Sequence, residues 1–260
     1  MDLGLAGKYA LITGASRGIG KAVARRFAEE GCRLTVAARS ADGLAALRDE
    51  IAGIHGTEVR DIALDLTEDG APARLADEAG PVDILINNAG AIPPGRLEEI
   101  DDAEWRAVWE LKLFGYINLI RAVYPRMAGA GGGAIVNICG ASGERPKANY
   151  ICGAVANAAL MAFTQALGGD SMNDGIRVIA LNPGPTETEH LVRLTRGSAA
   201  EKLGDADRWR ELWAPLPDGR AATVDEIADT AAFLVSPRSS YTSGTVVTVD
   251  GGYCNRGSLM

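Results

Sequence analysis

A glycine-rich turn near the N-terminus is the segment whose residue types and spacing most directly suggest chemistry. The apolar run YALIT leads into TGASRGIG, which places Gly14, Gly18 and Gly20 between that run and an amphipathic stretch. Glycines permit a tight turn and a close approach of the backbone, and the free N–H groups at a helix N-terminus favour negative charge. In a strand-turn-helix context this spacing predicts a site for the pyrophosphate of a dinucleotide.

Two arginines near this turn indicate which dinucleotide it is. When the cofactor is NAD, an acidic residue normally ends the second strand, because a carboxylate accepts hydrogen bonds from the adenosine ribose. Here the run VAARS puts Ala38 at that place, followed by Arg39, and Arg17 lies inside the glycine turn. Two guanidinium groups suit a 2′-phosphate, although both could instead be solvated surface side chains. The pattern favours NADP(H) over NAD(H).

Short apolar runs alternate with longer amphipathic stretches along the chain, and these elements must position the turn. We expect seven strands, over residues 9–13, 33–37, 58–64, 84–87, 134–138, 177–181 and 245–249. Helices are expected near residues 18–30, 41–52, 71–79, 102–127, 151–171 and 224–235. This alternation predicts an α/β fold, a Rossmann-like doubly wound seven-stranded parallel sheet with helices on both faces.

One segment, residues 187–217, breaks the alternation before the last helix. It has no strand pattern and carries Trp209 and Trp213. We interpret it as a substrate lid, in which the two tryptophans could form an apolar wall. No repeat or linker indicates a further domain, so residues 1–260 are expected to form a single dinucleotide-binding domain.

The composition limits the classes of function. A formal charge of −8 disfavours nucleic-acid binding, which needs concentrated Lys and Arg. The four cysteines form no CxxC pair and there are only two histidines, so no metal site is expected. We expect no targeting segment and no membrane span, because no long, uninterrupted apolar run is evident. Reduced thiols in the cytoplasm are the expected state.

Over essentially its whole length, the chain resembles the short-chain dehydrogenase/reductase family. The matching motifs are TGASRGIG, the aspartate of ALDL, NNAG at residues 87–90, NPGPTET at residues 182–188, and SGTVVTVDGG near the C-terminus. The resemblance implies that Asp65 contacts adenine and that Asn87 and Gly90 line the adenosine ribose. The cofactor-binding set that it implies, from the pyrophosphate turn to the nicotinamide end, is Gly14, Ser16, Arg17, Gly18, Ile19, Gly20, Arg39, Asp65, Leu66, Asn87, Ala89, Gly90, Pro183, Gly184, Thr186 and Thr188.

The chain departs from the family at the catalytic positions. Family members use an Asn, Ser, Tyr and Lys set, in which tyrosine transfers the proton and lysine lowers its pKa. An alignment without gaps places Gly140 at the serine, Gly153 at the tyrosine and Asn157 at the lysine, while Lys112 stands where the family carries asparagine. Lysine and asparagine are thus exchanged between two helices. Lys112 could supply charge or a proton and Asn157 could orient Lys112 or a water, or the site has drifted and Lys112 extends to solvent.

Tyr150 and Ser142 are the candidates to replace the missing hydroxyl groups. Tyr150 lies three residues before Gly153, which is about 4.5 Å along a helix axis and roughly 60° out of phase. Only a rearranged loop would bring its hydroxyl to the usual point. Ser142 lies two residues after Gly140 and could equally be an ordinary loop serine.

Two functions remain open at this stage. The first is an NADP(H)-dependent oxidoreductase that transfers hydride between nicotinamide and a small-molecule carbonyl or alcohol. The second is an NADP-binding sensor or scaffold of the same fold without hydride transfer, which the missing Ser, Tyr and Lys favour. The resemblance also implies a homotetramer or homodimer, with interfaces on helices 102–127 and 151–171 and on the last strand.

Overall fold

The sheet has seven strands, and every pairing in it is parallel. In this computed structural model, which describes residues 1–257, the strand order is β3-β2-β1-β4-β5-β6-β7. The strands are β1 Tyr9–Thr13, β2 Arg33–Ala38, β3 Val59–Ala63, β4 Ile84–Asn87, β5 Gly133–Ile138, β6 Ile176–Pro183 and β7 Thr245–Val249. The order reverses between β1 and β4, and ligands of such sheets bind beyond the carboxyl ends of the strands at that point. The predicted fold is confirmed.

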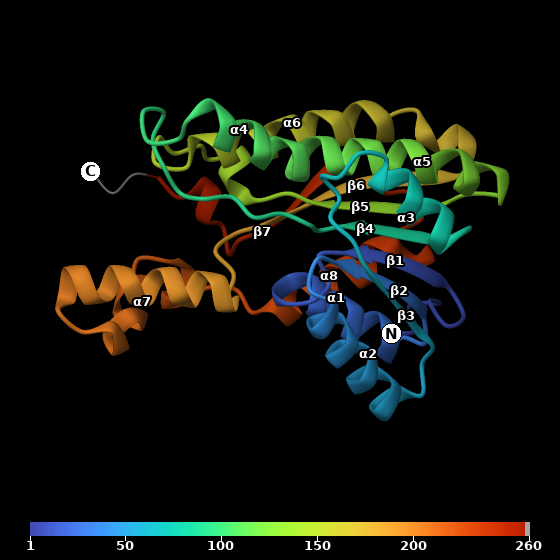
Figure 1. Ribbon diagram of the computed structural model, residues 1–260, viewed down its shortest axis with the longest axis horizontal. Helices are drawn as coiled ribbons and strands as arrows, with labels where there is room; N and C mark the ends of the chain where they lie inside the picture. The colour runs from blue at the N-terminus through green and yellow to red at the C-terminus, as the bar shows by residue number, and fades with distance from the viewer. Residues whose placement is uncertain (258–260) are drawn as a thin grey trace.

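Helices cover both faces of the sheet (Figure 1). One face carries α1 Gly18–Glu29, α2 Ala41–His55 and α8 Val224–Val235, and the other carries α3 Ala71–Ala79, α4 Asp102–Trp109, α5 Gly115–Gly129 and α6 Ile151–Gly168. Each face has its own apolar core, with Phe27 of α1 buried on one side and Leu119 of α5 on the other. Because both faces are covered, the central strands are apolar throughout, as in parallel sheets generally.

The helix expected over residues 102–127 is not continuous. A π-helical turn, Glu110–Phe114, separates α4 from α5 and contains Lys112. A π-turn holds one more residue per turn than an α-helix and rotates the side chains that follow it. This corrects the prediction of one regular helix and places the irregularity at a candidate catalytic residue.

The segment 187–217 is helical and projects from the sheet on the left of Figure 1. It contains α7 Glu189–Leu203 and a 3₁₀ segment, Ala206–Trp213, which pack against each other. The rings of Trp209 and Trp213 lie edge to face with centroids 4.6 Å apart, and both are buried with Ala199 and Ala221. The expectation of an open apolar wall is therefore wrong for these two side chains. They form the core of the projecting segment, which is far from the main core.

Among the described residues, α6 is long and apolar enough, by length and composition, to cross a membrane. Half of it is buried within the protein, as in a core helix, and it includes Asn157, Thr164 and Gln165. The other half is exposed or partly exposed and includes Val155, which is 42% exposed. The sequence reading missed the length of this apolar stretch because small and polar residues interrupt it.

Candidate functional site

The glycine turn has a shape that only glycine permits. Gly14 and Gly18 have φ values of 65° and 57°, in the left-handed region. A Cβ atom on Gly20 would lie 2.4 Å from the carbonyl oxygen of Gly14, and one on Gly14 would lie 2.9 Å from the Cα of Ala89. Arg17, which precedes α1, makes no side-chain cap to that helix. The first N–H groups of α1 therefore remain available to an anion, and the turn fits a dinucleotide pyrophosphate.

The turn is fixed by contacts with the NNAG segment that follows β4. Thr13 Oγ1 accepts hydrogen bonds from the backbone N–H of Asn88 at 3.0 Å and of Ala89 at 3.1 Å. The Nδ2 of Asn88 donates to the carbonyl oxygens of Thr13 and Gly14, each at 3.1 Å. Sequence reasoning did not single out Thr13, although its place at the end of β1 is the available signal.

Asn87 lies deeper than the family resemblance implied. It is fully buried, and its Nδ2 donates to Asn137 Oδ1 at 3.0 Å, while Asn137 Nδ2 donates to Thr164 Oγ1 at 3.0 Å. The Asn87 side chain thus joins a polar row beneath the strand ends. Its Oδ1 is buried with no hydrogen-bond partner among the described residues. Gly90, three residues later, is exposed. The glycine turn contacts both the NNAG segment and Thr188 of the NPGPTET segment, and we call the face that these three segments form the cofactor groove.

At the adenosine end, Arg39 and Asp65 lie side by side. Arg39 Nη1 is 3.8 Å from Asp65 Oδ2, and the Arg39 side chain is mostly exposed. Asp65 Oδ1 accepts hydrogen bonds from the N–H of Thr67 at 3.0 Å and from its hydroxyl at 2.8 Å. Burial alone would raise the pKa of Asp65, but the two Thr67 hydrogen bonds and the charge of Arg39 together lower it. Arg17 is exposed within the glycine turn, and Arg39 is exposed directly after β2.

At the other end of the groove, the NPGPTET segment leads from β6 into α7. The N–H of Gly184 donates to the carbonyl of Val249 at 2.9 Å, and Thr186 Oγ1 donates to the carbonyl of Gly184 at 3.0 Å. Thr188 caps α7, and its methyl carbon would lie 3.4 Å from a Cβ on Gly18. The start of the projecting segment therefore lies directly over the glycine turn.

Lys112 is buried beside Gly90, at the edge of this groove. Only 6% of it is exposed, and a Cβ on Gly90 would lie 3.0 Å from the Lys112 Cδ. Its Nζ donates to the carbonyl oxygen of Ile138 at 2.6 Å and to the hydroxyl of Tyr116 at 3.0 Å. Burial lowers the pKa of Lys112 to about 8. The alternative of a lysine that extends to solvent is therefore wrong.

Asn157 and Ser142 are brought together at a different point. Asn157 is buried, its Nδ2 donates to Ser142 Oγ at 2.9 Å, and its Oδ1 has no partner among the described residues. A Cβ on Gly140 would lie 2.8 Å from Asn157 Nδ2, so the Asn157 amide occupies the space that a serine at 140 would need. Asn157 and Lys112 have separate hydrogen-bond partners. The expectation that Asn157 directly orients Lys112 is wrong, because the two side chains are held by different elements.

Tyr150 occupies the space left by Gly153. It precedes α6, and a Cβ on Gly153 would lie 2.3 Å from Cε1 and 2.7 Å from Cζ of the Tyr150 ring. The ring therefore fills the place where a side chain at 153 would begin. Burial raises the pKa of Tyr150 to about 12. Tyr150 thus stays protonated near neutral pH, where it can donate a proton but is a poor base.

Two residues that the sequence reading missed hold the loop after β5. Asn182 Oδ1 accepts a hydrogen bond from the N–H of Gly140 at 2.9 Å, and Asn182 Nδ2 donates to Glu144 Oε1 at 2.9 Å. Asn182 opens the NPGPTET motif, which was the available signal. Glu144 lies in a loop whose sequence gave no sign of this contact.

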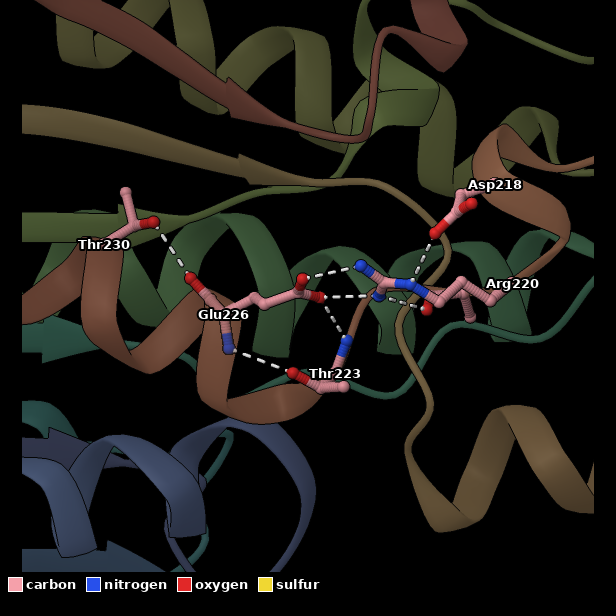
Figure 2. Close-up of polar contacts among 6 residues, drawn as sticks. Asp218, Arg220, Thr223, Glu226 and Thr230 are labelled. Atoms are coloured by element: carbon pink, nitrogen blue, oxygen red, sulfur yellow. Dashed lines mark hydrogen bonds and ion pairs between the residues drawn. The ribbon is translucent and has the colours of Figure 1, made fainter.

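The projecting segment is tied to the sheet at both of its ends. Near its start, the N–H of Glu187 donates to the carbonyl of Ala222 at 2.8 Å, in a short bridge between Thr186 and Ala222. Figure 2 shows the anchor after its end, where two nitrogens of Arg220 donate to the Glu226 carboxylate at 2.9 and 2.8 Å. Arg220 and the Thr223 N–H lower the pKa of Glu226 to about 2.

Known proteins resemble this chain in sequence and in fold. A family model described as enoyl-(acyl carrier protein) reductase matches residues 14–254. The 3-oxoacyl-(acyl-carrier-protein) reductase of Vibrio cholerae is 34% identical over 257 residues, covering 96% of this chain and 98% of that protein. The cis-4-hydroxycyclohexanecarboxylate dehydrogenase of Sinomonas cyclohexanicum is 36% identical over 261 residues, covering 97% and 99%. The structure of L-sorbose reductase from Gluconobacter frateurii, complexed with NADPH and L-sorbose, has a TM-score of 0.92 and 32% identity, covering 99% of this chain and 100% of that chain.

These matches span nearly the whole chain and agree with the strand order, the glycine turn and the NNAG and NPGPTET segments. The resemblance drawn from the motifs is confirmed. The chain belongs to the short-chain dehydrogenase/reductase family and is an NAD(P)-dependent oxidoreductase that transfers hydride between nicotinamide and a carbonyl or alcohol carbon.

Proposed function

We propose that this oxidoreductase prefers NADP(H), acts on a small hydroxylated or cyclic ketone or the corresponding alcohol, and transfers the proton through Lys112. The observation that carries the proposal is the buried Lys112 amine, which lies beside Gly90 of the NNAG segment and stands where the family carries its catalytic asparagine. The family lysine position is held by Asn157, so the only buried lysine side chain in the described part of the chain is Lys112.

Lys112 is suited to donate a proton near neutral pH. When bound, the reduced nicotinamide supplies the hydride to the carbonyl carbon. The Lys112 ammonium would donate a proton to the carbonyl oxygen as it gains negative charge, and the neutral amine would be protonated again from solvent. A pKa of about 8 matches this task, because a general acid works best when its pKa lies near the working pH. Its burial also strengthens the attraction between the ammonium and an oxyanion.

Tyr150, Asn157 and Ser142 have supporting roles in this scheme. Tyr150 is a second proton donor, held in its neutral form by burial. The free Oδ1 of Asn157 can accept a hydrogen bond from a ligand hydroxyl. Ser142 Oγ accepts from Asn157 Nδ2, which leaves the serine proton free to be donated.

The preference for NADP(H) rests on Arg17 and Arg39. Both side chains are exposed near the adenosine end, and Ala38 stands where an acidic residue would favour NAD(H). L-sorbose reductase was solved with NADPH, whereas a related 7α-hydroxysteroid dehydrogenase was solved with NADH, so the family alone does not decide. The relatives named for L-sorbose and for cis-4-hydroxycyclohexanecarboxylate support the substrate class.

We further infer that segment 187–217 acts as a lid, that residues 1–260 form a single domain, and that copies of the chain associate as a homodimer or homotetramer. The lid is supported by the position of Thr188 over Gly18. Association is supported by two exposed large apolar side chains, Val155 of α6 and Phe114, which lies two residues after Lys112. Four free thiols support a reducing compartment such as the cytoplasm.

The decisive experiment compares the protein with Lys112→Met. Oxidation of NADPH would be followed with ketoses, cyclic ketones and other small ketones, and Kd values for NADPH and NADH would be measured by calorimetry. We expect kcat to fall about 10²–10⁴-fold in the variant, the usual contribution of a positioned acid, with the Kd for NADPH nearly unchanged. Tighter binding of NADH than of NADPH would overturn the cofactor preference. Equal turnover by both proteins would overturn the role of Lys112, and tight binding without turnover of any substrate would favour the sensor.

A further inference from the structure

Tyr116 is a fully buried tyrosine that has no place in the scheme above. It lies four residues after Lys112, and its hydroxyl is 3.0 Å from the Lys112 Nζ. The Nζ also lies 4.8 Å from the centroid of the Tyr116 ring. Lys112 lies within the π-helical turn Glu110–Phe114 and Tyr116 lies just after it, so this turn sets their relative rotation. Lys112 is thus paired with a tyrosine on the helix that faces α6. The sequence analysis did not predict this partner.

The directions of the hydrogen bonds in this cluster are fixed by chemistry. The carbonyl oxygen of Ile138 accepts from Lys112 Nζ at 2.6 Å and from the Tyr116 hydroxyl at 3.2 Å. A carbonyl has no proton to give, so the Tyr116 proton points to Ile138. The Tyr116 oxygen is then left to accept from Lys112. Both neighbours of the amine are therefore acceptors in this arrangement.

This arrangement leaves one direction at the amine nitrogen. A tetrahedral nitrogen has three positions besides its bond to Cε, and two of them are taken by Ile138 and Tyr116. The third has no hydrogen-bond partner among the described residues, and a Cβ on the exposed Gly90 would lie 3.7 Å from Nζ. In the ammonium form the third position holds a proton, and in the neutral amine it holds the lone pair.

We propose that Tyr116 is a positioning residue, which together with the Ile138 carbonyl holds two protons of Lys112 and directs its third, exchangeable position toward the cofactor groove. The proposal rests on the proposed role of Lys112 as proton donor. Tyr116 does not reach the groove itself, since it is fully buried behind the lysine.

Charge supports the same assignment. The titratable groups that face the Lys112 amine are Tyr116, at the start of α5, and Cys139, the residue after β5. Burial raises the pKa of Tyr116 well above its ordinary value and raises that of Cys139 to about 11. Both therefore stay neutral when Lys112 titrates. Loss of the Tyr116 oxygen would remove an acceptor from the ammonium form, and the pKa of Lys112 would fall.

The test is Tyr116→Phe, which removes one oxygen and keeps the ring. Its matched control is Tyr124→Phe, two turns after Tyr116 in α5. The Tyr124 hydroxyl donates to Asp174 Oδ2 at 2.7 Å and makes no hydrogen bond to Lys112. The Lys112 titration would be followed by NMR with ¹³Cε-labelled lysine, assigned with Lys112→Met, and kcat and KM would be measured against pH. We expect the Lys112 pKa and the matching limb of the kcat profile to move down by about one pH unit. At pH 8 we expect kcat to fall about fivefold with KM unchanged, because the ammonium fraction falls by that factor, while Tyr124→Phe changes neither quantity.

A second substitution guards against a fold defect in the first. Fluorotyrosine at position 116 keeps the hydroxyl but makes it a weaker acceptor, so a smaller shift of the Lys112 pKa in the same direction is expected. If neither substitution moves the titration, the proposal for Tyr116 is overturned. If the titration moves but Lys112→Met retains full turnover, the positioning of the amine stands and the proposed function fails. If Lys112→Met is inactive and Tyr116→Phe changes neither titration nor kcat, only the inference about Tyr116 fails.

Discussion

Glycines serve opposite purposes in the two halves of the groove. In the cofactor half, a Cβ on Gly20 or Gly14 would meet backbone atoms and the Asn88 amide that is bonded to that backbone, so these glycines let two backbone segments approach each other. In the catalytic half, a Cβ on Gly153 or Gly140 would meet the ends of side chains, the ring of Tyr150 and the amide of Asn157. The first pair lets neighbouring backbone segments pack closely, and the second pair gives space to neighbouring side chains.

This difference explains why one half keeps the family pattern and the other does not. A backbone contact can be made in few ways, so the turn that creates it needs glycine at fixed positions. A side chain can be moved to a neighbouring residue, provided that the position it leaves becomes small. Tyr150 and Gly153 form such an exchange, since the ring at 150 fits only because 153 has no side chain.

The largest effect is expected from Gly20→Ala in the cofactor half. The new methyl group would lie 2.4 Å from both the Gly14 carbonyl oxygen and Asn88 Nδ2, and the backbone must shift to admit it. Such overpacking costs about 1–3 kcal/mol. If the strained turn loses that much binding free energy, its Kd for NADPH rises by up to about 100-fold. Calorimetric titration with NADPH measures the loss.

The control for this variant is Gly53→Ala in α2, where a Cβ would meet nothing within 4 Å. Alanine is the better helix former by about 0.5–1 kcal/mol, so this variant should be slightly more stable and bind NADPH normally. Normal NADPH binding by Gly20→Ala would contradict the account of the turn.

A smaller and different effect is expected from Gly153→Ala in the catalytic half. The methyl group would lie 2.3 Å from Cε1 of Tyr150, whose ring can swing toward solvent because it is only half-buried. We expect kcat to fall to the level of Tyr150→Phe, a loss of stability of about 1 kcal/mol, and a Kd for NADPH within about twofold of the original. Steady-state kinetics and calorimetry on the same samples separate these quantities.

The double variant Gly153→Ala with Tyr150→Phe sharpens this result. If Gly153 acts only by admitting the Tyr150 hydroxyl, the second substitution should add nothing to the loss of kcat. A large additional loss, or a weaker Kd for NADPH, would show that the two halves of the groove are not independent.

The same contrast explains what the sequence could predict. The sheet and the glycine turn follow from local patterns, namely apolar runs, helix starts and glycines with positive φ at 14 and 18. The catalytic half depends on contacts between distant elements. Lys112 could be found by alignment, but its burial against Ile138 comes from the π-helical turn, which has no clear sequence signal. Likewise, Trp209 and Trp213 indicate apolar packing without indicating that they pack on each other.

The smallest effect is expected outside both halves, at the Arg220–Glu226 pair that anchors the projecting segment (Figure 2). The pKa of Glu226 is lowered from 4.5 to about 2, so the pair stabilises the fold above pH 4.5 and this contribution is lost as the pH falls toward 2. Because both side chains are about half exposed, Glu226→Gln should cost at most about 1 kcal/mol at pH 7. The cost should vanish near pH 2. Thermal unfolding measured against pH tests this, with Glu201→Gln, at an exposed position in α7, as the control.

The same variant tests whether the anchor affects the cofactor half. A glutamine retains the capping geometry with Thr223, so NADPH binding should not change. If Glu226→Gln instead weakened NADPH binding as strongly as Gly20→Ala, the anchor of the projecting segment would be part of the cofactor half. The cofactor half would then depend on this side-chain pair as well as on the backbone contacts of its glycines.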